Sequence, residues 1–192
     1  DFIIKERPKK LILIEKDNAL SNNLSIKYKN LSQVKVINND VLKINFFDFK
    51  NCTVFSNLPY NISTKIILHL LTNNKNINEM IFMVQKEVAI KFDYNLIKMN
   101  KYKFFTKLYS SYKRCFDVPP SVFIPKPKVH STVVKFKLNK RNIDQEKAIN
   151  FSNKIFSNMR KKIKNNISIV NLENHVLLSK RPEQLTIKNL LY

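Results

Sequence analysis

The sequence predicts an α/β fold with a mostly parallel sheet, followed by a small all-α module. Short apolar runs, typical of buried strands, alternate with segments of helical periodicity between residues 10 and 84. Several of these runs end in a polar residue. From about residue 140 the strand signals stop, while helical spacing continues to the end. We therefore expect one domain over residues 1–139 and a helical domain over residues 140–192.

The first half of the chain is expected to contribute four strands. Residues 10–15 follow Pro8 and form an apolar run that ends in an acid, as buried parallel strands do. The other expected strands are residues 34–38, 53–56 and 80–84. Helices are expected over residues 17–31 and 63–72, the second with Ser63 or Thr64 as its N-cap.

The following segment is expected to add one helix and two strands. Residues 103–113 have helical spacing, whereas residues 114–118 and 131–138 have the composition of strands. In the last of these, Thr132, Val134 and Phe136 alternate with Val133, Lys135 and Lys137. Residues 119–128 lie between the two strands and contain four prolines, which favour an extended loop.

Polar side chains stand where the expected parallel strands end. They are Glu15, Asp40, Asn57 and Gln85. Ligands of parallel α/β sheets bind beyond the carboxyl ends of the strands. The sequence therefore predicts a site at this edge of the sheet.

The chain carries a large positive charge. In 192 residues, 35 Lys and Arg stand against 14 Asp and Glu, which gives a formal net charge of +21. Such an excess predicts a polyanionic partner, with nucleic acid favoured over an anionic membrane surface. Hydrophobic residues make up 44% of the chain, enough for a packed core without disulfides or metals.

Other composition features bear on compartment and metal binding. Cys52 and Cys115 lie far apart and have no CxxC companions, which is typical of reduced cysteines in an intracellular protein. The apolar runs are too short to span a bilayer and no signal peptide is visible. We expect a cytoplasmic or organellar protein without a membrane anchor. The three histidines are scattered, so we expect no metal site.

The tetrapeptide at residues 57–60, Asn-Leu-Pro-Tyr, suits chemistry on an adenine amine. The lone pair of that amine is delocalised into the ring, so the amine is a poor nucleophile. The Asn57 amide oxygen and the Leu58 carbonyl can accept its two hydrogens, while Tyr60 stacks on the base. Pro59 stiffens the turn. The alternative is an ordinary strand-to-helix turn, in which these residue types are common.

The same tetrapeptide belongs to a series of motifs that resembles the ribosomal RNA adenine dimethylase family. The series continues with VQKEVA at residues 84–89 and FIPKPKVHS at residues 123–131. The segments FDVPPS (116–121), FSNMRKK (156–162) and KRPEQL (180–185) resemble its bacterial small-subunit, kasugamycin-resistance type. The resemblance covers nearly the whole chain.

This resemblance implies a fold, a reaction and a partner. The fold is the Rossmann-like sheet of class I S-adenosylmethionine-dependent methyltransferases, mostly parallel with an antiparallel edge strand. The reaction is dimethylation, at N6, of adjacent adenosines near the 3′ end of small-subunit (16S) rRNA in ribosome biogenesis. The expected partner is the small ribosomal subunit, and the expected state is a monomer.

The resemblance also implies roles for residues. Glu15 matches the acid that binds the cofactor ribose, although a solvent-facing strand-end acid is the alternative. Asp40 matches the residue that binds the cofactor adenine, with a helix N-cap as the alternative. Asn57 matches a residue that faces both cofactor and target. Phe123 matches an aromatic that closes the other side of the target base, with a core position as the alternative. We assign no catalytic step to Gln85 or Glu87, which match a segment of the family near the site.

Basic residues are expected to bind RNA phosphates, although a charge run can be only a solvated face. Two lysines, Lys126 and Lys128, flank the proline-rich loop, and a basic group in the tail is expected to crowd one helix. That group consists of Arg160, Lys161, Lys162 and Lys164, with Lys154 nearby.

The sequence departs from the family pattern at its start. It contains no glycine, where ordinary usage would give about thirteen, so the family's glycine-rich cofactor loop is absent. The helix-like residues 1–6 match the segment after that loop, and we expect an N-terminal truncation. Two alternatives stay open: a large-subunit rRNA methyltransferase of the antibiotic-resistance type, and a non-catalytic RNA-binding assembly factor.

Overall fold

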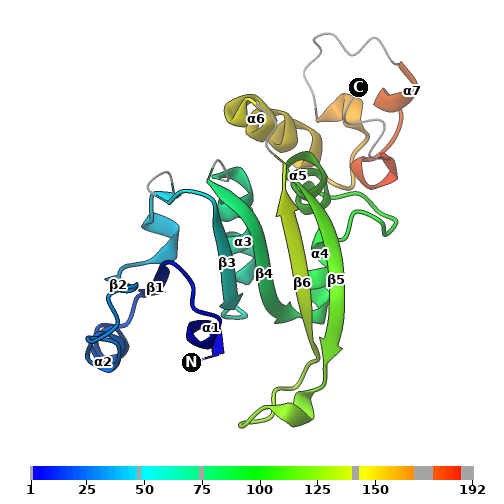
Figure 1. Ribbon diagram of the computed structural model, residues 1–192. Helices are drawn as coiled ribbons and strands as arrows, with labels where there is room; N and C mark the ends of the chain where they lie inside the picture. Colours follow the sequence, from blue (N-terminus) through cyan, green and yellow to red (C-terminus); the bar gives the residue numbers. More distant parts are fainter. Residues whose placement is uncertain (1, 47–48, 74–75, 140–142, 167–174, 187–192) are drawn as a thin grey trace. The chain divides into compact units, whose positions relative to one another are not determined.

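The computed structural model describes all residues except 1, 47–48, 74–75, 140–142, 167–174 and 187–192 (Figure 1). It forms two compact units, Asp1–Asn45 and Phe46–Tyr192. The domain boundary predicted after residue 139 lies at residues outside the described ranges.

The first unit is a two-stranded parallel sheet with a helix packed on it. The helix α1 (Phe2–Lys5) precedes β1 (Leu11–Glu15), which pairs in parallel with β2 (Val34–Asn38). The helix α2 (Asn18–Lys27) connects the two strands. The short 3₁₀ helix η1 (Val41–Lys43) follows β2. Asp17 caps α2, because its side chain accepts a hydrogen bond from the backbone N–H of Leu20 at 2.9 Å.

The second unit is built on a four-stranded sheet in the order β3-β4-β6-β5. The strands are β3 (Cys52–Asn57), β4 (Ile77–Gln85), β5 (Ser110–Val118) and β6 (Ser131–Leu138). β3 and β4 are parallel, while β6 runs antiparallel to both of its neighbours. The antiparallel strand was expected at the edge of the sheet, but it lies one position inside, and the edge is β5.

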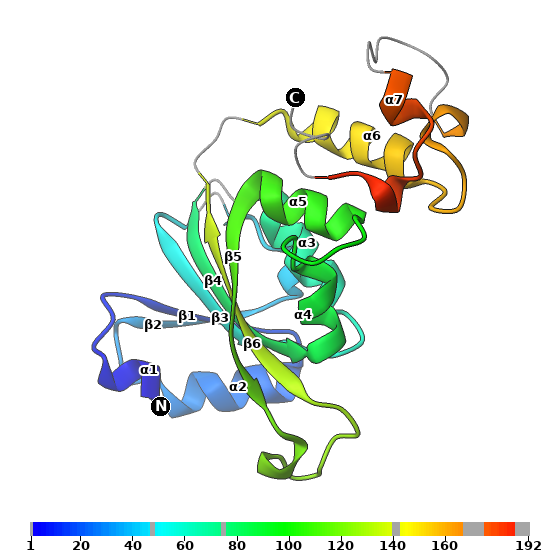
Figure 2. The same cartoon turned by 90° about the vertical axis from the view of Figure 1, so that its right-hand side faces the viewer.

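Three helices cover one face of this sheet: α3 (Ser63–Thr72), α4 (Lys86–Phe92) and α5 (Lys101–Tyr109) (Figure 2). The apolar face of α3 places Ile66, Ile67, Leu70 and Leu71 in the core. From β6, Phe136 is fully buried and its ring centroid lies 5.0 Å from Tyr112, 5.8 Å from Phe92 and 6.3 Å from Phe82. This aromatic cluster joins α4 to the sheet.

The C-terminal segment is helical in its described parts. It contains α6 (Gln145–Phe156), η4 (Ile163–Asn165), α7 (His175–Leu178) and η5 (Pro182–Gln184). A small core of Met99, Ile155, Ile163 and Leu185 packs this segment against the chain before α5. The Met99 N–H also donates to the carbonyl of Glu183 at 3.0 Å. The segment therefore shares a core with the rest of the second unit.

Three local predictions were wrong. Residues 110–113 form the start of β5 and not the end of a helix, because Ser110 and Tyr112 alternate inward and pair with Leu138 and Phe136 of β6. The cap of α3 is Ile62, without a side-chain hydrogen bond, and Ser63 is already inside the helix. The helix α4 was not expected, because it continues directly from β4 without a turn signal.

The basic tail residues also lie differently than expected. Lys154 is in α6, but Arg160, Lys161 and Lys162 follow its end and Lys164 is in η4. The amide of Asn166 ends α6 by donating to the carbonyls of Ile155 and Asn158, at 3.1 and 3.0 Å. The basic group is thus spread over a helix, a turn and a 3₁₀ helix.

Candidate active site

The carboxyl edge of the first unit carries Glu15 at the end of β1. Its side chain is half-buried, and Oε1 accepts a hydrogen bond from the N–H of Asp17 at 2.9 Å. Within the described residues, no hydrogen bond occupies Oε2. Asn38, at the end of β2, secures this edge by donating its amide to the carbonyls of Glu15 and Lys16, at 3.0 and 3.3 Å.

Asp40 lies just beyond the end of β2 and is the N-cap of η1. Its Oδ1 accepts from the N–H of Leu42 at 3.0 Å, and its Oδ2 lies 3.2 Å from Nζ of Lys16. The Leu42 N–H and then Lys16 lower the pKa of Asp40 below its ordinary value of 3.8. The capping role that was the alternative for Asp40 is therefore present in the structure.

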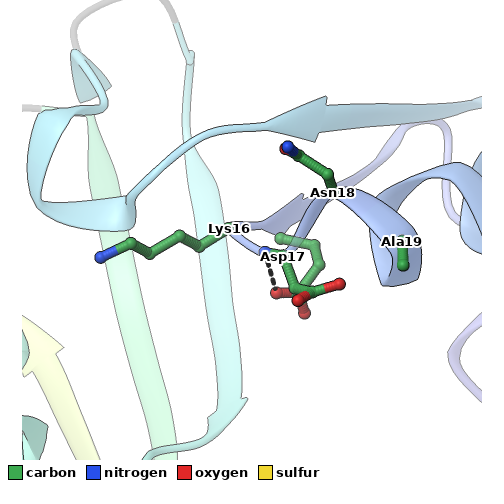
Figure 3. A pocket seen from close by; sticks show the side chains of 5 residues that line it. Lys16, Asp17, Asn18 and Ala19 are labelled. Carbon is green, nitrogen blue, oxygen red and sulfur yellow. Dashed lines mark hydrogen bonds between the residues drawn. The ribbon is translucent and has the colours of Figure 1, made fainter.

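An open hollow of about 660 Å³ lies beside this edge, lined by Glu15, Lys16, Asp17, Asn18 and Ala19 (Figure 3). Figure 3 shows Lys16 extended away from Asp17, Asn18 and Ala19.

The side chains at this edge suit the ribose and adenine of S-adenosylmethionine. A ribose diol needs carboxylate acceptors, which Glu15 offers. An adenine amine needs an acceptor such as Asp40, whose ion pair involves a lysine side chain that is 76% exposed. Such an exposed pair is weak and exchanges easily.

The second unit carries the Asn57–Tyr60 turn at the carboxyl end of β3. The turn is anchored by Leu58, which is 4% exposed and donates its N–H to the carbonyl of Met83 at 3.1 Å. The Asn57 side chain is exposed. Among the described residues, no hydrogen bond occupies that side chain or the Leu58 carbonyl. Two acceptors therefore remain available at this strand end.

Tyr60 is held at both ends. Its phenol oxygen shares a hydrogen bond with Oγ of Ser131 at 3.1 Å, and its carbonyl accepts from Oγ of Ser63 at 3.3 Å. Tyr60 is 38% exposed, while Ser131 and Ser63 are fully buried. Tyr60 therefore offers a fixed, partly exposed aromatic face.

The proline-rich loop reaches the same edge of the sheet, because β5 ends and β6 begins there (Figure 1). Phe123 follows the 3₁₀ helix η3 (Pro120–Val122) and is half-buried, whereas Lys126 and Lys128 are exposed. The structure thus brings the Asn57–Tyr60 turn, Gln85 and the loop of Phe123 to one edge of the second unit. Glu15 and Asp40 belong to the first unit.

A polar network at this edge was not foreseen from the sequence. Asp117 accepts from Nζ of Lys86 at 2.9 Å, from Oγ1 of Thr132 at 2.8 Å and from Arg114 at 3.4 Å. Lys86, followed by Thr132, lowers the pKa of Asp117 from 3.8 to about 2. Asp117 lies in the FDVPPS segment and Lys86 in the VQKEVA segment, but their contact depends on the register of β4, β5 and β6.

The predicted RNA-binding residues of the tail are all exposed: Lys154, Arg160, Lys161, Lys162 and Lys164. Two further observations concern other classes of site. Within the described ranges, no group of three or more His, Cys, Asp and Glu is arranged to hold a metal ion. None of the described helices has the length and apolarity needed to cross a membrane.

Comparison with known proteins places these features in a family. Residues 2–191 match the family of ribosomal RNA adenine dimethylases. Several relatives carry the name ribosomal RNA small subunit methyltransferase A, and three of them follow. The relative from Hydrogenobaculum sp. is 32% identical over 100% of this chain, that from Malacoplasma penetrans 39% over 86%, and that from Borreliella burgdorferi 34% over 98%. The chain spans 75%, 62% and 71% of their respective lengths.

Solved structures share the fold. A dimethyladenosine transferase from Plasmodium falciparum superposes with a TM-score of 0.70 at 23% identity, covering 95% of this chain and 80% of that one. The 23S rRNA methyltransferase ErmE gives 0.64 at 18% identity, covering 91% of this chain and 78% of that one. These likenesses confirm the predicted Rossmann-like methyltransferase fold.

The motif resemblance predicted the same family as these matches. The chain belongs to the ribosomal RNA adenine dimethylase family, because the family matches residues 2–191 and relatives are 32% to 39% identical over most of its length.

Proposed function

We propose that this chain carries the target-base site of an enzyme that dimethylates N6 of adjacent adenosines near the 3′ end of small-subunit rRNA. The family consists of S-adenosylmethionine-dependent rRNA adenine dimethyltransferases. The small-subunit substrate is supported by relatives named for it. The observation that carries the proposal is the Asn57–Tyr60 turn, which offers two available acceptors beside an anchored aromatic ring.

The acceptors address the weak nucleophilicity of the adenine amine. When the Asn57 amide oxygen and the Leu58 carbonyl accept both N6 hydrogens, the nitrogen becomes more tetrahedral and its lone pair turns towards the methyl donor. S-adenosylmethionine supplies the methyl group from a positively charged sulfonium. No general base is required, because the N6 proton can leave to water after the transfer.

Other residues support binding in this account. Tyr60 stacks on one face of the adenine and Phe123 closes the other, so the base must leave its stack to enter. Glu15 and Asp40 bind the ribose and adenine of the cofactor, and Asn57 also faces the cofactor. The exposed basic residues of the loop and tail contact phosphates and position the folded RNA. The chain acts as a monomer on the small subunit, in the cytoplasm or in an organelle.

Asn57→Ala tests the proposal. We expect methylation of undermethylated small subunits to fall about 100-fold or more, as when one preorganised donor or acceptor is removed from a reaction centre. Binding of the subunit should change little, because phosphate contacts dominate it. Asn61→Ala, which removes an exposed asparagine directly after the turn, is the matched control. Equal methylation by Asn57→Ala and wild type would refute the role of Asn57.

A further inference from the structure

The hydroxyl of Ser131 holds the ring of Tyr60 from a distant part of the chain. The phenol oxygen and Oγ lie 3.1 Å apart, although the residues are separated by 71 positions. Ser131 is fully buried, whereas Tyr60 is 38% exposed. A partly exposed tyrosine normally turns its hydroxyl to water. Here the hydroxyl is tied to a buried residue, although Tyr60 as a whole remains partly exposed.

Ser131 is itself fixed by the sheet. It is the first residue of β6 and pairs with Gln85 of β4 on one side and with Val118 of β5 on the other. Just before it, the carbonyl of His130 accepts the N–H of Lys86 at 2.9 Å. Just after it, Thr132 donates its hydroxyl to Asp117 at 2.8 Å. The anchor therefore has little freedom to move.

The other end of Tyr60 is tied to α3. Its carbonyl accepts from Ser63, the fully buried first residue of that helix. With backbone and hydroxyl both held, the ring loses the rotations that a free tyrosine would have. An aromatic ring that is already oriented loses less conformational entropy when a base stacks on it.

We propose that Ser131 is a positioning residue that orients Tyr60 for stacking on the target adenine. The inference rests on the proposed function and extends it to a residue that touches neither the base nor the cofactor. It also gives a role to the last residue of the FIPKPKVHS segment, which the chemistry of the turn leaves unused.

Single and double variants test this coupling. Tyr60→Phe keeps the ring and removes only the hydroxyl, and Ser131→Ala removes only its partner. Each should lower kcat by about 3- to 10-fold, as expected from the loss of one neutral hydrogen bond. The double variant should be no slower than either single variant, because both remove the same interaction. Subunit binding should not change.

Ser110→Ala is the matched control. Ser110 is also a buried serine at the start of a strand, 2% exposed, and its hydroxyl donates to the carbonyl of Thr106 at 2.8 Å. It lies at the opposite end of the sheet, opposite Leu138. We expect this variant to keep the wild-type kcat. Equal losses in Ser110→Ala and Ser131→Ala would overturn a specific role for Ser131.

A second measurement observes the anchor without catalysis. In chain labelled with ¹³C on the tyrosine rings, the Tyr60 signal is assigned by its loss in Tyr60→Phe. We expect this signal to move towards the position of a free tyrosine in Ser131→Ala and to stay unchanged in Ser110→Ala. An unchanged signal in Ser131→Ala, or a double variant whose kcat loss is the product of the single losses, would overturn the anchor.

The two measurements separate the inference from the proposed function. A wild-type enzyme that makes no dimethyladenosine contradicts the proposed function, and with it the positioning role of Ser131. An active enzyme in which Ser131→Ala has no effect contradicts only the inference.

Discussion

Reversing the charge of Lys161 and Lys162 should weaken binding of the small subunit in a salt-dependent way. Both side chains are exposed in the turn between α6 and η4. Neighbouring Ile163, which is 1% exposed, and its N–H bond to the carbonyl of Lys180 at 2.9 Å hold this turn to the core. The substitutions Lys161→Glu and Lys162→Glu therefore change surface charge without removing a packed group.

The expected magnitude follows from how many RNA phosphates the two lysines neutralise. Each neutralised phosphate adds about 0.7 to 0.9 to the slope of log K against log salt, so two phosphates add about 1.4 to 1.8. At about 0.15 M salt, removing both corresponds to roughly a 15- to 30-fold weaker affinity, before any repulsion from the new carboxylates.

A filter-binding titration with small subunits at several salt concentrations measures both quantities. The matched control is Lys113→Glu with Lys137→Glu, which makes the same change of charge at exposed positions on β5 and β6. We expect the control to keep most of the wild-type slope. If the tail variant has the wild-type slope and affinity, then Lys161 and Lys162 do not face the RNA.

Two further predictions concern the fold that carries the site. Phe136→Ala should lower the free energy of unfolding by about 3–5 kcal/mol, because it empties a fully buried position among three other rings. Urea titration measures this, and a loss as small as that of exposed Lys137→Ala would contradict the packing. For Asp117, the folded-state pKa of about 2 lies below the ordinary 3.8. Its ionised form therefore contributes stability above about pH 4, and this contribution disappears as the pH falls towards 2. The stability difference between wild type and Asp117→Asn should stay constant from neutral pH to about pH 4 and shrink below it. A difference that grows on acidification would contradict the ion pair.

The sequence predicted most strands, and the polar ends of the parallel ones, well, because both depend on local patterns. Residues 34–38 and 131–138 were predicted with the observed bounds. A site at the polar strand ends could be predicted from the rule that ligands bind beyond the carboxyl ends of parallel strands. The motifs predicted the family, which the comparisons confirm.

The errors arose where tertiary contacts decide the structure. Residues 110–113 have helical spacing, but pairing of Tyr112 with Phe136 makes them a strand. The basic tail was expected on one helix, but the amide of Asn166 ends α6 before Arg160. Local propensity is a weak predictor in such places, because a long-range partner outweighs it.

Hydrogen bonds between residues far apart in the chain could not be predicted from the sequence. The contact of Tyr60 with Ser131, and the Asp117 network, depend on which strands are neighbours and in what register. A shift of one residue in β6 would turn Ser131 to the other face of the sheet. The roles of Glu15, Asp40, Asn57 and Phe123 stay predictions that binding and kinetic measurements must decide.

The most direct test of the central claim is detection of the product. Undermethylated small subunits are incubated with S-adenosylmethionine and the wild-type chain, and in parallel with the Asn57→Ala variant. Their rRNA is then digested and analysed by mass spectrometry. We expect N6,N6-dimethyladenosine near the 3′ end of the small-subunit rRNA with the wild-type chain and none with Asn57→Ala. Absence of this product with the wild-type chain, while subunit binding is retained, would contradict methylation by this chain and favour a non-catalytic assembly factor.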